Sequence, residues 1–148
     1  MSAVLEISHW VAASPEVVWN AFTTPELFHQ FFAPEGLSIP FDSIVMEFEV
    51  GGRFEFNMVF DESGDVNPNK GIIKEIEQPH RLVFCEPDFM GAELLSTQTF
   101  MPENGGTLIT VTQEGLPEEF IGNPEVLEAF RSSYRKLGCV LNVATENR

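Results

Sequence analysis

The most regular pattern in the chain is the alternation of apolar and polar residues in RFEFNMVF, residues 53–60. Successive side chains of an extended chain point to opposite faces, so the apolar residues of this segment share one face and the polar residues share the other. The pattern predicts an antiparallel strand with one buried and one solvated face. We expect the buried face to consist of Phe54, Phe56, Met58 and Phe60.

Turn residues divide the middle of the chain into a series of such segments. The breaks between them are rich in Gly, Pro, Asn and Asp, and the longest, at 61–69, reads DESGDVNPN. Short connections force neighbouring strands to run antiparallel. The predicted strands are residues 42–50, 52–60, 70–77, 81–86, 93–101 and 107–115.

Two short helices are predicted between an N-terminal strand at 3–12 and this series. Ser14 and Thr24 each precede a Pro-Glu pair. Ser or Thr caps a helix N-terminus, Pro fits the first helical position, and Glu interacts favourably with the positive end of the helix dipole. Each helix has only about two or three turns, so both need a larger element to pack against. The N-terminal strand alternates more loosely, with apolar residues at Val4, Ile7 and Trp10.

A long helix is predicted from Pro124 to about Thr145. At about 20 residues it would span roughly 30 Å, enough to cross most of a sheet. The element order therefore predicts an α+β fold in which a strongly curved antiparallel sheet wraps around this helix, with the two short helices closing one end. The apolar residues that recur at helical spacing are Val126, Leu127, Phe130, Tyr134, Leu137 and Leu141.

Length and composition favour one domain, which we expect to cover residues 1–148. A domain of this length buries about two-thirds of the surface of its unfolded chain. Apolar residues make up 43% and charged residues 21%, which is typical of globular proteins and excludes a disordered or fibrous chain.

Charge and cysteine content exclude several classes of function. The chain has 23 acidic and 8 basic residues and a net charge of −15, which repels nucleic-acid phosphates and anionic lipid head groups. Cys85 and Cys139 are too few and too isolated for a disulfide framework or a zinc site. No leader-like N-terminus and no apolar stretch of membrane-spanning length is present. We expect a cytoplasmic protein without membrane insertion.

Several short motifs follow one another in a fixed order along nearly the whole chain. They are SPEVVW at 14–19 with AFT at 21–23 and PE at 25–26, VGGRF at 50–54, GIIKEI at 71–76 with Pro79 and RLVF at 81–84, and GTL at 106–108 with TVT at 110–112 and EGL at 114–116. Their order and spacing resemble the START-like superfamily, also called SRPBCC or helix-grip proteins. Within it, the chain is most similar to the family related to the C-terminal domain of the heat-shock protein 90 ATPase activator.

This resemblance implies a helix-grip fold and a stand-alone copy of the C-terminal-type domain. The chain departs from the family pattern at residues near the expected interior. His29 is present near the second helix, where His and Trp are common in the family, but residues 85–87, Cys-Glu-Pro, stand where an aromatic is common. Gln113 stands where His is frequent. Roles that the family gives to those side chains do not carry over to these positions.

The resemblance also implies a cavity between the long helix and the concave face of the sheet, which many relatives use to hold a hydrophobic small molecule. Apolar residues on these faces can equally be ordinary core. Polar ones are more informative, since a buried amide without a partner costs about 1–3 kcal/mol, although backbone groups or buried water can also satisfy them. The candidate ligand-binding residues are Phe54, Phe56, Met58, Ile73, Phe84, Gln98, Val111, Gln113, Phe130 and Tyr134.

The sequence offers little for catalysis, so no catalytic residue, metal or cofactor is predicted. The three histidines, His9, His29 and His80, are far apart in sequence, and no nucleophile elbow or phosphate-binding loop is present. A carboxylate in or near the cavity could act as a general acid or base if burial raised its pKa. The candidates for that role are Glu55, Glu75 and Glu114, although strand carboxylates usually face water.

Three functions remain open. The first is a non-catalytic domain that binds a small hydrophobic or amphipathic ligand, such as a lipid, in the cavity. The second is a co-chaperone that binds a chaperone, as the family name suggests, with a role in the stress response. The third and least favoured is an enzyme of the cyclase or dehydratase type. We expect no nucleic-acid partner, and either a monomer or a homodimer.

Overall fold

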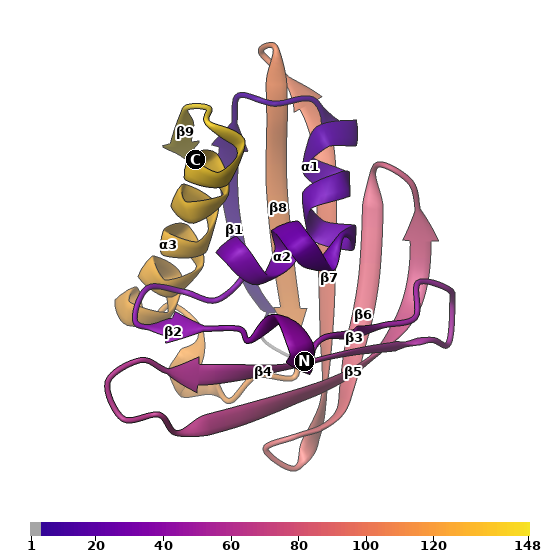
Figure 1. Ribbon diagram of the computed structural model, residues 1–148, viewed down its shortest axis with the longest axis vertical. Helices are drawn as coiled ribbons and strands as arrows, with labels where there is room; N and C mark the ends of the chain where they lie inside the picture. The colour runs from indigo at the N-terminus through magenta and orange to yellow at the C-terminus, as the bar shows by residue number, and fades with distance from the viewer. Residues whose placement is uncertain (1–3) are drawn as a thin grey trace.

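A computed structural model of the chain describes residues 4–148, and in them a curved nine-stranded antiparallel sheet surrounds the concave side on which the helices lie (Figure 1). The strands are β1 (Val4–Val11), β2 (Leu37–Ser38), β3 (Val45–Met46), β4 (Arg53–Phe60), β5 (Val66–Glu77), β6 (Arg81–Phe89), β7 (Ala92–Glu103), β8 (Gly106–Glu114) and β9 (Thr145–Asn147). Their order across the sheet is β2-β4-β5-β6-β7-β8-β1-β9, and β3 also pairs with β4. The predicted helix-grip fold is confirmed.

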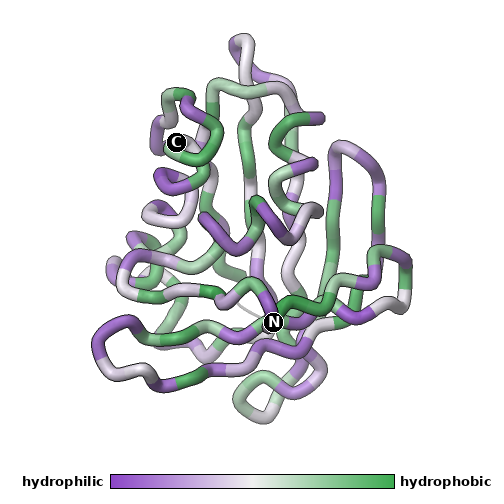
Figure 2. The backbone as a smooth tube through the Cα atoms, in the orientation of Figure 1, coloured by the Kyte–Doolittle hydropathy of each residue, from purple (hydrophilic) through white to green (hydrophobic). Residues whose placement is uncertain are grey.

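The helices are α1 (Pro15–Thr23), α2 (Pro25–Phe31) and α3 (Pro124–Leu141), with 3₁₀ turns at Phe41–Ser43 and Glu118–Phe120. Helix α1 packs on β7 and β8, while α2 packs on α3. Apolar and polar residues alternate within the turns of α1 and α3, so each helix turns one side toward the sheet (Figure 2). None of the described helices combines the length and hydrophobicity that a membrane-crossing helix requires.

The predicted helix starts are present. The Ser14 hydroxyl accepts a hydrogen bond from the backbone N–H of Val17 at 3.4 Å. At the start of α2 the Thr24 hydroxyl makes no capping bond and instead donates to Asn20 Oδ1 at 3.0 Å. Pro occupies the first turn of both helices, so its missing N–H leaves no hydrogen bond unmade.

The end of the long helix is corrected from Thr145 to Leu141. Asn142 adopts a left-handed conformation with φ of 58°, and its N–H bonds to the carbonyls of Gly138 and Cys139, which terminates the helix. The chain then turns back, and β9 pairs with β1 at the edge of the sheet. The helical spacing of apolar residues extends to Leu141. The strand β9 that follows has only three residues, which is too short to show a periodic pattern in the sequence.

The predicted strand at 42–50 is wrong. Only β3, two residues long, pairs with β4 there, and residues 47–52 form a compact turn. The N–H of Glu47 bonds to the carbonyl of Arg53 at 2.8 Å, and the N–H of Gly52 bonds to the carbonyl of Glu49 at 2.9 Å. A Cβ atom on Gly52 would overlap the carbonyl oxygen of Glu47, so the turn needs glycine at that position.

Three other strands are longer than predicted, and β7 gains one residue at its start and two at its end. β5 begins at Val66 instead of residue 70, because the polar stretch 66–69 pairs with the second half of β4. β6 continues to Phe89, and the hairpin to β7 turns on Met90 and Gly91, both with positive φ. Asn and Pro in these stretches are typical of turns, which is why the sequence placed breaks there. Of these extra residues, Asn69 and Phe89 border the cavity described below.

Aromatic side chains fill much of the core. Phe54 lies between Phe28, at 5.4 Å between ring centroids, and Phe84, at 4.9 Å. Along β4 burial falls from Phe54, which is 2% exposed, to Phe60, which is 45% exposed, so Phe60 does not share the buried face as predicted. In β1 the inward residues are Leu5, Ile7, His9 and Val11, while Val4 and Trp10 lie on the other face.

Candidate functional site

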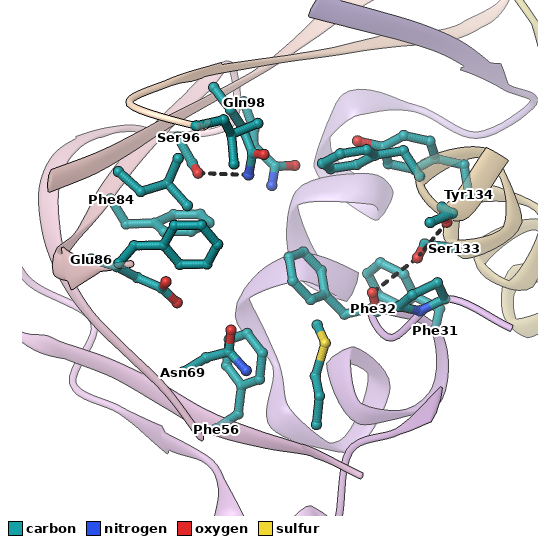
Figure 3. Close-up of a pocket in the computed structure, with 18 residues that line it drawn as sticks. Phe31, Phe32, Phe56, Asn69, Phe84, Glu86, Ser96, Gln98, Ser133 and Tyr134 are labelled. Atoms are coloured by element: carbon teal, nitrogen blue, oxygen red, sulfur yellow. Dashed lines mark hydrogen bonds between the residues drawn. The ribbon is translucent and has the colours of Figure 1, made fainter. Parts of the chain in front are cut away.

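A cavity of about 220 Å³ lies between α3, the end of α2 and the concave face of the sheet (Figure 3). Strands β4 to β8 form one wall, and α2, the residues after it, and α3 form the other. Most of the lining is apolar, with a few polar groups among the aromatic rings. It is lined by Phe31, Phe32, Pro34, Phe56, Met58, Asn69, Phe84, Glu86, Phe89, Leu94, Ser96, Gln98, Gln113, Leu116, Ala129, Phe130, Ser133 and Tyr134.

Seven of the ten predicted site residues lie in this lining, and their contact with a ligand stays a prediction. The other three, Phe54, Ile73 and Val111, are buried in the packed core outside the cavity. Phe54 is covered by Phe28 on one side and stacked on Phe84 on the other. The seven lining residues are Phe56, Met58, Phe84, Gln98, Gln113, Phe130 and Tyr134.

The second short helix contributes aromatic residues that the sequence analysis did not name as site residues. Phe31 ends α2 and Phe32 follows it, and both border the cavity. The ring of Phe32 stacks on Phe28 at 4.4 Å and meets the edge of Phe56 at 5.6 Å. The predicted role of this helix in closing one end of the sheet was the signal that could have identified them.

Three of the polar groups are satisfied within the protein. Gln113 donates from Nε2 to the hydroxyl of Ser96 at 3.0 Å. The Ser133 hydroxyl donates to the backbone carbonyl of Phe32 at 3.0 Å, which ties α3 to the residue after α2. Both bonds are visible at the cavity wall in Figure 3. These groups therefore hold the walls in place.

Gln98 differs from them. Its side chain is 2% exposed, and no hydrogen-bond partner for its Oε1 atom exists among residues 4–148. An unpaired buried acceptor is costly and uncommon in folded proteins. Gln98 is therefore the polar group of the cavity wall that most needs a partner.

Tyr134 closes the α3 side of the cavity. It is 4% exposed, and burial raises the pKa of its hydroxyl. Its ring stacks on His9 of β1 at 5.4 Å between centroids. Burial, with a smaller effect from Arg135, lowers the pKa of His9 to about 4. The sequence analysis noted only that the histidines lie far apart in the sequence. The contact between His9 and Tyr134 depends on how α3 packs against β1, which the sequence pattern does not show.

The carboxylate of the cavity is Glu86, which the sequence analysis did not name as a site candidate. It lies two residues beyond Phe84 on the same face of β6, and burial raises the pKa of its carboxyl group. Of the predicted carboxylates, Glu55 pairs with Arg53 at 3.5 Å and Glu75 pairs with Arg81 at 3.5 Å. Glu55, Glu75 and Glu114 do not line the cavity.

Phe89 lies at the mouth of the cavity. It borders the cavity itself and two further open hollows, one beside β5 and one beside α3. The extended hairpin of β6 and β7 places it there, three residues beyond Glu86.

The family follows from comparison with known proteins. Residues 12–142 match the model of the family described as Activator of Hsp90 ATPase homolog 1-like protein. The chain belongs to this family. No protein in a search of curated sequences matches it.

Solved structures similar to this Activator of Hsp90 ATPase homolog 1-like domain share its fold. A crystal structure from Rhodobacter sphaeroides is 26% identical, with a TM-score of 0.83 over 94% of this chain and 92% of its own. The AHSA1 protein from Silicibacter pomeroyi is 25% identical, with a TM-score of 0.75 over 95% and 98%. A protein from Chromobacterium violaceum is 21% identical, with a TM-score of 0.81 over 93% and 96%.

Two of the four residues that the sequence analysis set apart from the expected family pattern lie at the cavity. Glu86 and Gln113 both line it. His29 lies outside the cavity lining, with its ring against Phe41 at 5.4 Å. In residues 4–148 no group of His, Cys, Asp and Glu is arranged to hold a metal ion.

Proposed function

We propose that the protein binds a small, predominantly apolar molecule in the cavity between α3 and the sheet. The observation that carries this proposal is a hollow in an otherwise densely packed aromatic core. Protein interiors are close-packed, with few voids larger than a water molecule, and ligand sites are concave, mostly apolar and carry a few placed polar groups. The hollow of about 220 Å³ has a lining of this kind.

The size of the cavity limits the ligand. An engineered cavity of about 150 Å³ holds benzene, whereas pockets for drug-sized ligands start at about 300 Å³. The cavity, at about 220 Å³, lies between these values. A compact molecule with one or two rings fits this space, and Phe32, Phe84 and Phe130 supply flat surfaces against it.

The test is binding of one-ring and two-ring aromatic compounds, measured by thermal shift and native mass spectrometry. Ala129→Phe on α3 would place a benzyl group in the cavity, since Ala129 lines it. Ala144→Phe adds the same group at an exposed residue outside the cavity. We expect wild type and Ala144→Phe to bind and Ala129→Phe to lose binding. Equal binding by all three proteins would place the ligand elsewhere, and no binding by wild type would remove the proposal.

The family match supports a second candidate, action on a heat-shock protein 90. The supporting observation is the match of residues 12–142 itself. ATP turnover by the purified chaperone, with and without this protein, tests it. Stimulation by wild type and by Ala129→Phe alike would indicate a surface interaction that does not use the cavity, whereas unchanged turnover would remove this candidate.

A further inference from the structure

The unpaired acceptor of Gln98 indicates which polar group a ligand needs. Its Oε1 atom is buried and lacks a donor among the described residues, although the side chain borders a cavity. The neighbouring amide of Gln113 is already engaged with Ser96 and so does not serve Gln98. Leaving such an acceptor unpaired reduces binding by about fivefold to a hundredfold relative to a ligand that pairs it.

The hydroxyl group of Tyr134 is the second polar group at this end of the cavity. Figure 3 shows the amide of Gln98 and the ring of Tyr134 facing one another across one end of the cavity. Stacking on His9 fixes the tyrosine ring, so the hydroxyl has a defined place beside the hollow. Burial raises the pKa of the Tyr134 hydroxyl above its usual value. The phenol therefore remains an O–H donor.

One functional group satisfies both side chains. A hydroxyl group can donate to Gln98 Oε1 and accept from the Tyr134 O–H at the same time. A carbonyl group can accept from the Tyr134 O–H or from the amide N–H of Gln98 but cannot donate, so it leaves Gln98 Oε1 unpaired, and a hydrocarbon pairs with neither side chain. The end of the cavity formed by Gln98 and Tyr134 is thus complementary to an alcohol or phenol.

Charge excludes the acidic analogues. Among the residues that line the cavity in the described chain, none is Lys, Arg or His, and the one carboxylate is Glu86. A ligand carboxylate or phosphate would enter a largely apolar space without a counter-ion, which is strongly unfavourable. The net charge of −15 adds long-range repulsion of anions.

We propose that the cavity selects an uncharged one-ring or two-ring molecule bearing a hydroxyl group, which Gln98 and Tyr134 recognise together. This inference rests on the proposed binding function. Two roles are thereby assigned within the cavity. The aromatic residues provide affinity for the rings of the ligand, and Gln98 and Tyr134 together provide selectivity for its hydroxyl group.

The experiment compares three probes of one shape: 2-naphthol, naphthalene and 2-naphthoic acid, with dissociation constants from competition titrations at pH 7. We expect wild type to bind 2-naphthol at least tenfold more tightly than naphthalene, and 2-naphthoate most weakly. Gln98→Leu removes the acceptor and should reduce the naphthol preference to within about threefold, without weakening naphthalene. Tyr134→Phe removes only the hydroxyl and should lose part of the preference.

Gln30→Leu is the matched control. It makes the same substitution at an exposed glutamine of α2 that does not line the cavity. The control should keep the wild-type ratio between 2-naphthol and naphthalene. If Gln98→Leu does not fold, the test relies on Tyr134→Phe, which keeps the aromatic ring stacked on His9.

The outcomes separate this inference from the function on which it rests. Tight binding of naphthalene and 2-naphthol with equal affinity overturns the hydroxyl selection and leaves the binding function standing. A preference that survives both Gln98→Leu and Tyr134→Phe also overturns it, as does tighter binding of 2-naphthoate. Binding of none of the three probes counts against the cavity function itself.

Discussion

Replacement of His9 by Phe should make the protein more resistant to acid. His9 lies on the inward face of β1, stacked on Tyr134, and neither ring nitrogen has a hydrogen-bond partner among the described residues. Burial and the nearby charges of Arg135 and Arg131 lower its pKa from 6.5 to about 4. Asn147 of β9 acts in the opposite direction, although its contact falls short of hydrogen-bond geometry.

The sign and size follow from linkage. Above pH 6.5 His9 is neutral in both the folded and the unfolded chain, so it adds no pH dependence. As the pH falls from 6.5 toward 4, the unfolded chain binds the proton first and the folded state loses stability. At about 1.36 kcal/mol per pKa unit, the loss reaches up to about 3 kcal/mol, of which about 2 kcal/mol is already lost at pH 5.

The assay is urea unfolding at pH 7 and pH 5, followed by tryptophan fluorescence. Phe keeps a ring on Tyr134 but cannot bind a proton. Carboxylates titrate in both proteins, so the difference between the two pH-dependent losses isolates His9. We expect His9→Phe to lose about 2 kcal/mol less than wild type between pH 7 and pH 5. Equal losses would refute the reasoning that His9 is buried and neutral.

Further predictions concern stability and are checked by urea unfolding. Burial raises the pKa of Glu86, so Glu86→Gln should stabilise the protein at pH 7, with a gain that disappears as the pH falls through 4.5; a constant gain would contradict it. Phe54→Ala should cost about 3–5 kcal/mol, but Phe60→Ala, at an exposed residue, only about 0.5 kcal/mol. Gly52→Ala should destabilise the protein because the new Cβ meets the Glu47 carbonyl, and wild-type stability would argue against this turn.

The elements that the sequence predicted are those whose signals are local. Ser14 starts α1 through a bond to a residue three positions away, and the alternation in β4 predicted which side chains of that strand point inward near Phe54. Gln98 and Gln113 reach the cavity because alternation along their own strands sets their direction. Such features need no knowledge of distant parts of the chain.

The features that the sequence missed depend on distant contacts. His9 meets Tyr134 only because β1 runs next to the concave side that α3 covers. Phe89 reaches the cavity because β6 continues through a Pro-containing stretch that is typical of a turn. The curvature of the sheet decides that Phe54 is core whereas Phe56, two residues away, borders the cavity. No local pattern encodes that curvature.

The central claim, that an uncharged hydroxylated ring compound occupies the hollow between α3 and the sheet, is tested most directly by NMR with 2-naphthol and isotope-labelled protein. We predict intermolecular nuclear Overhauser effects from the naphthol protons to Phe56, Phe84 and Phe130, and the largest amide side-chain shift at Gln98. Saturable binding without contacts to these residues, or no binding at all, would contradict the account.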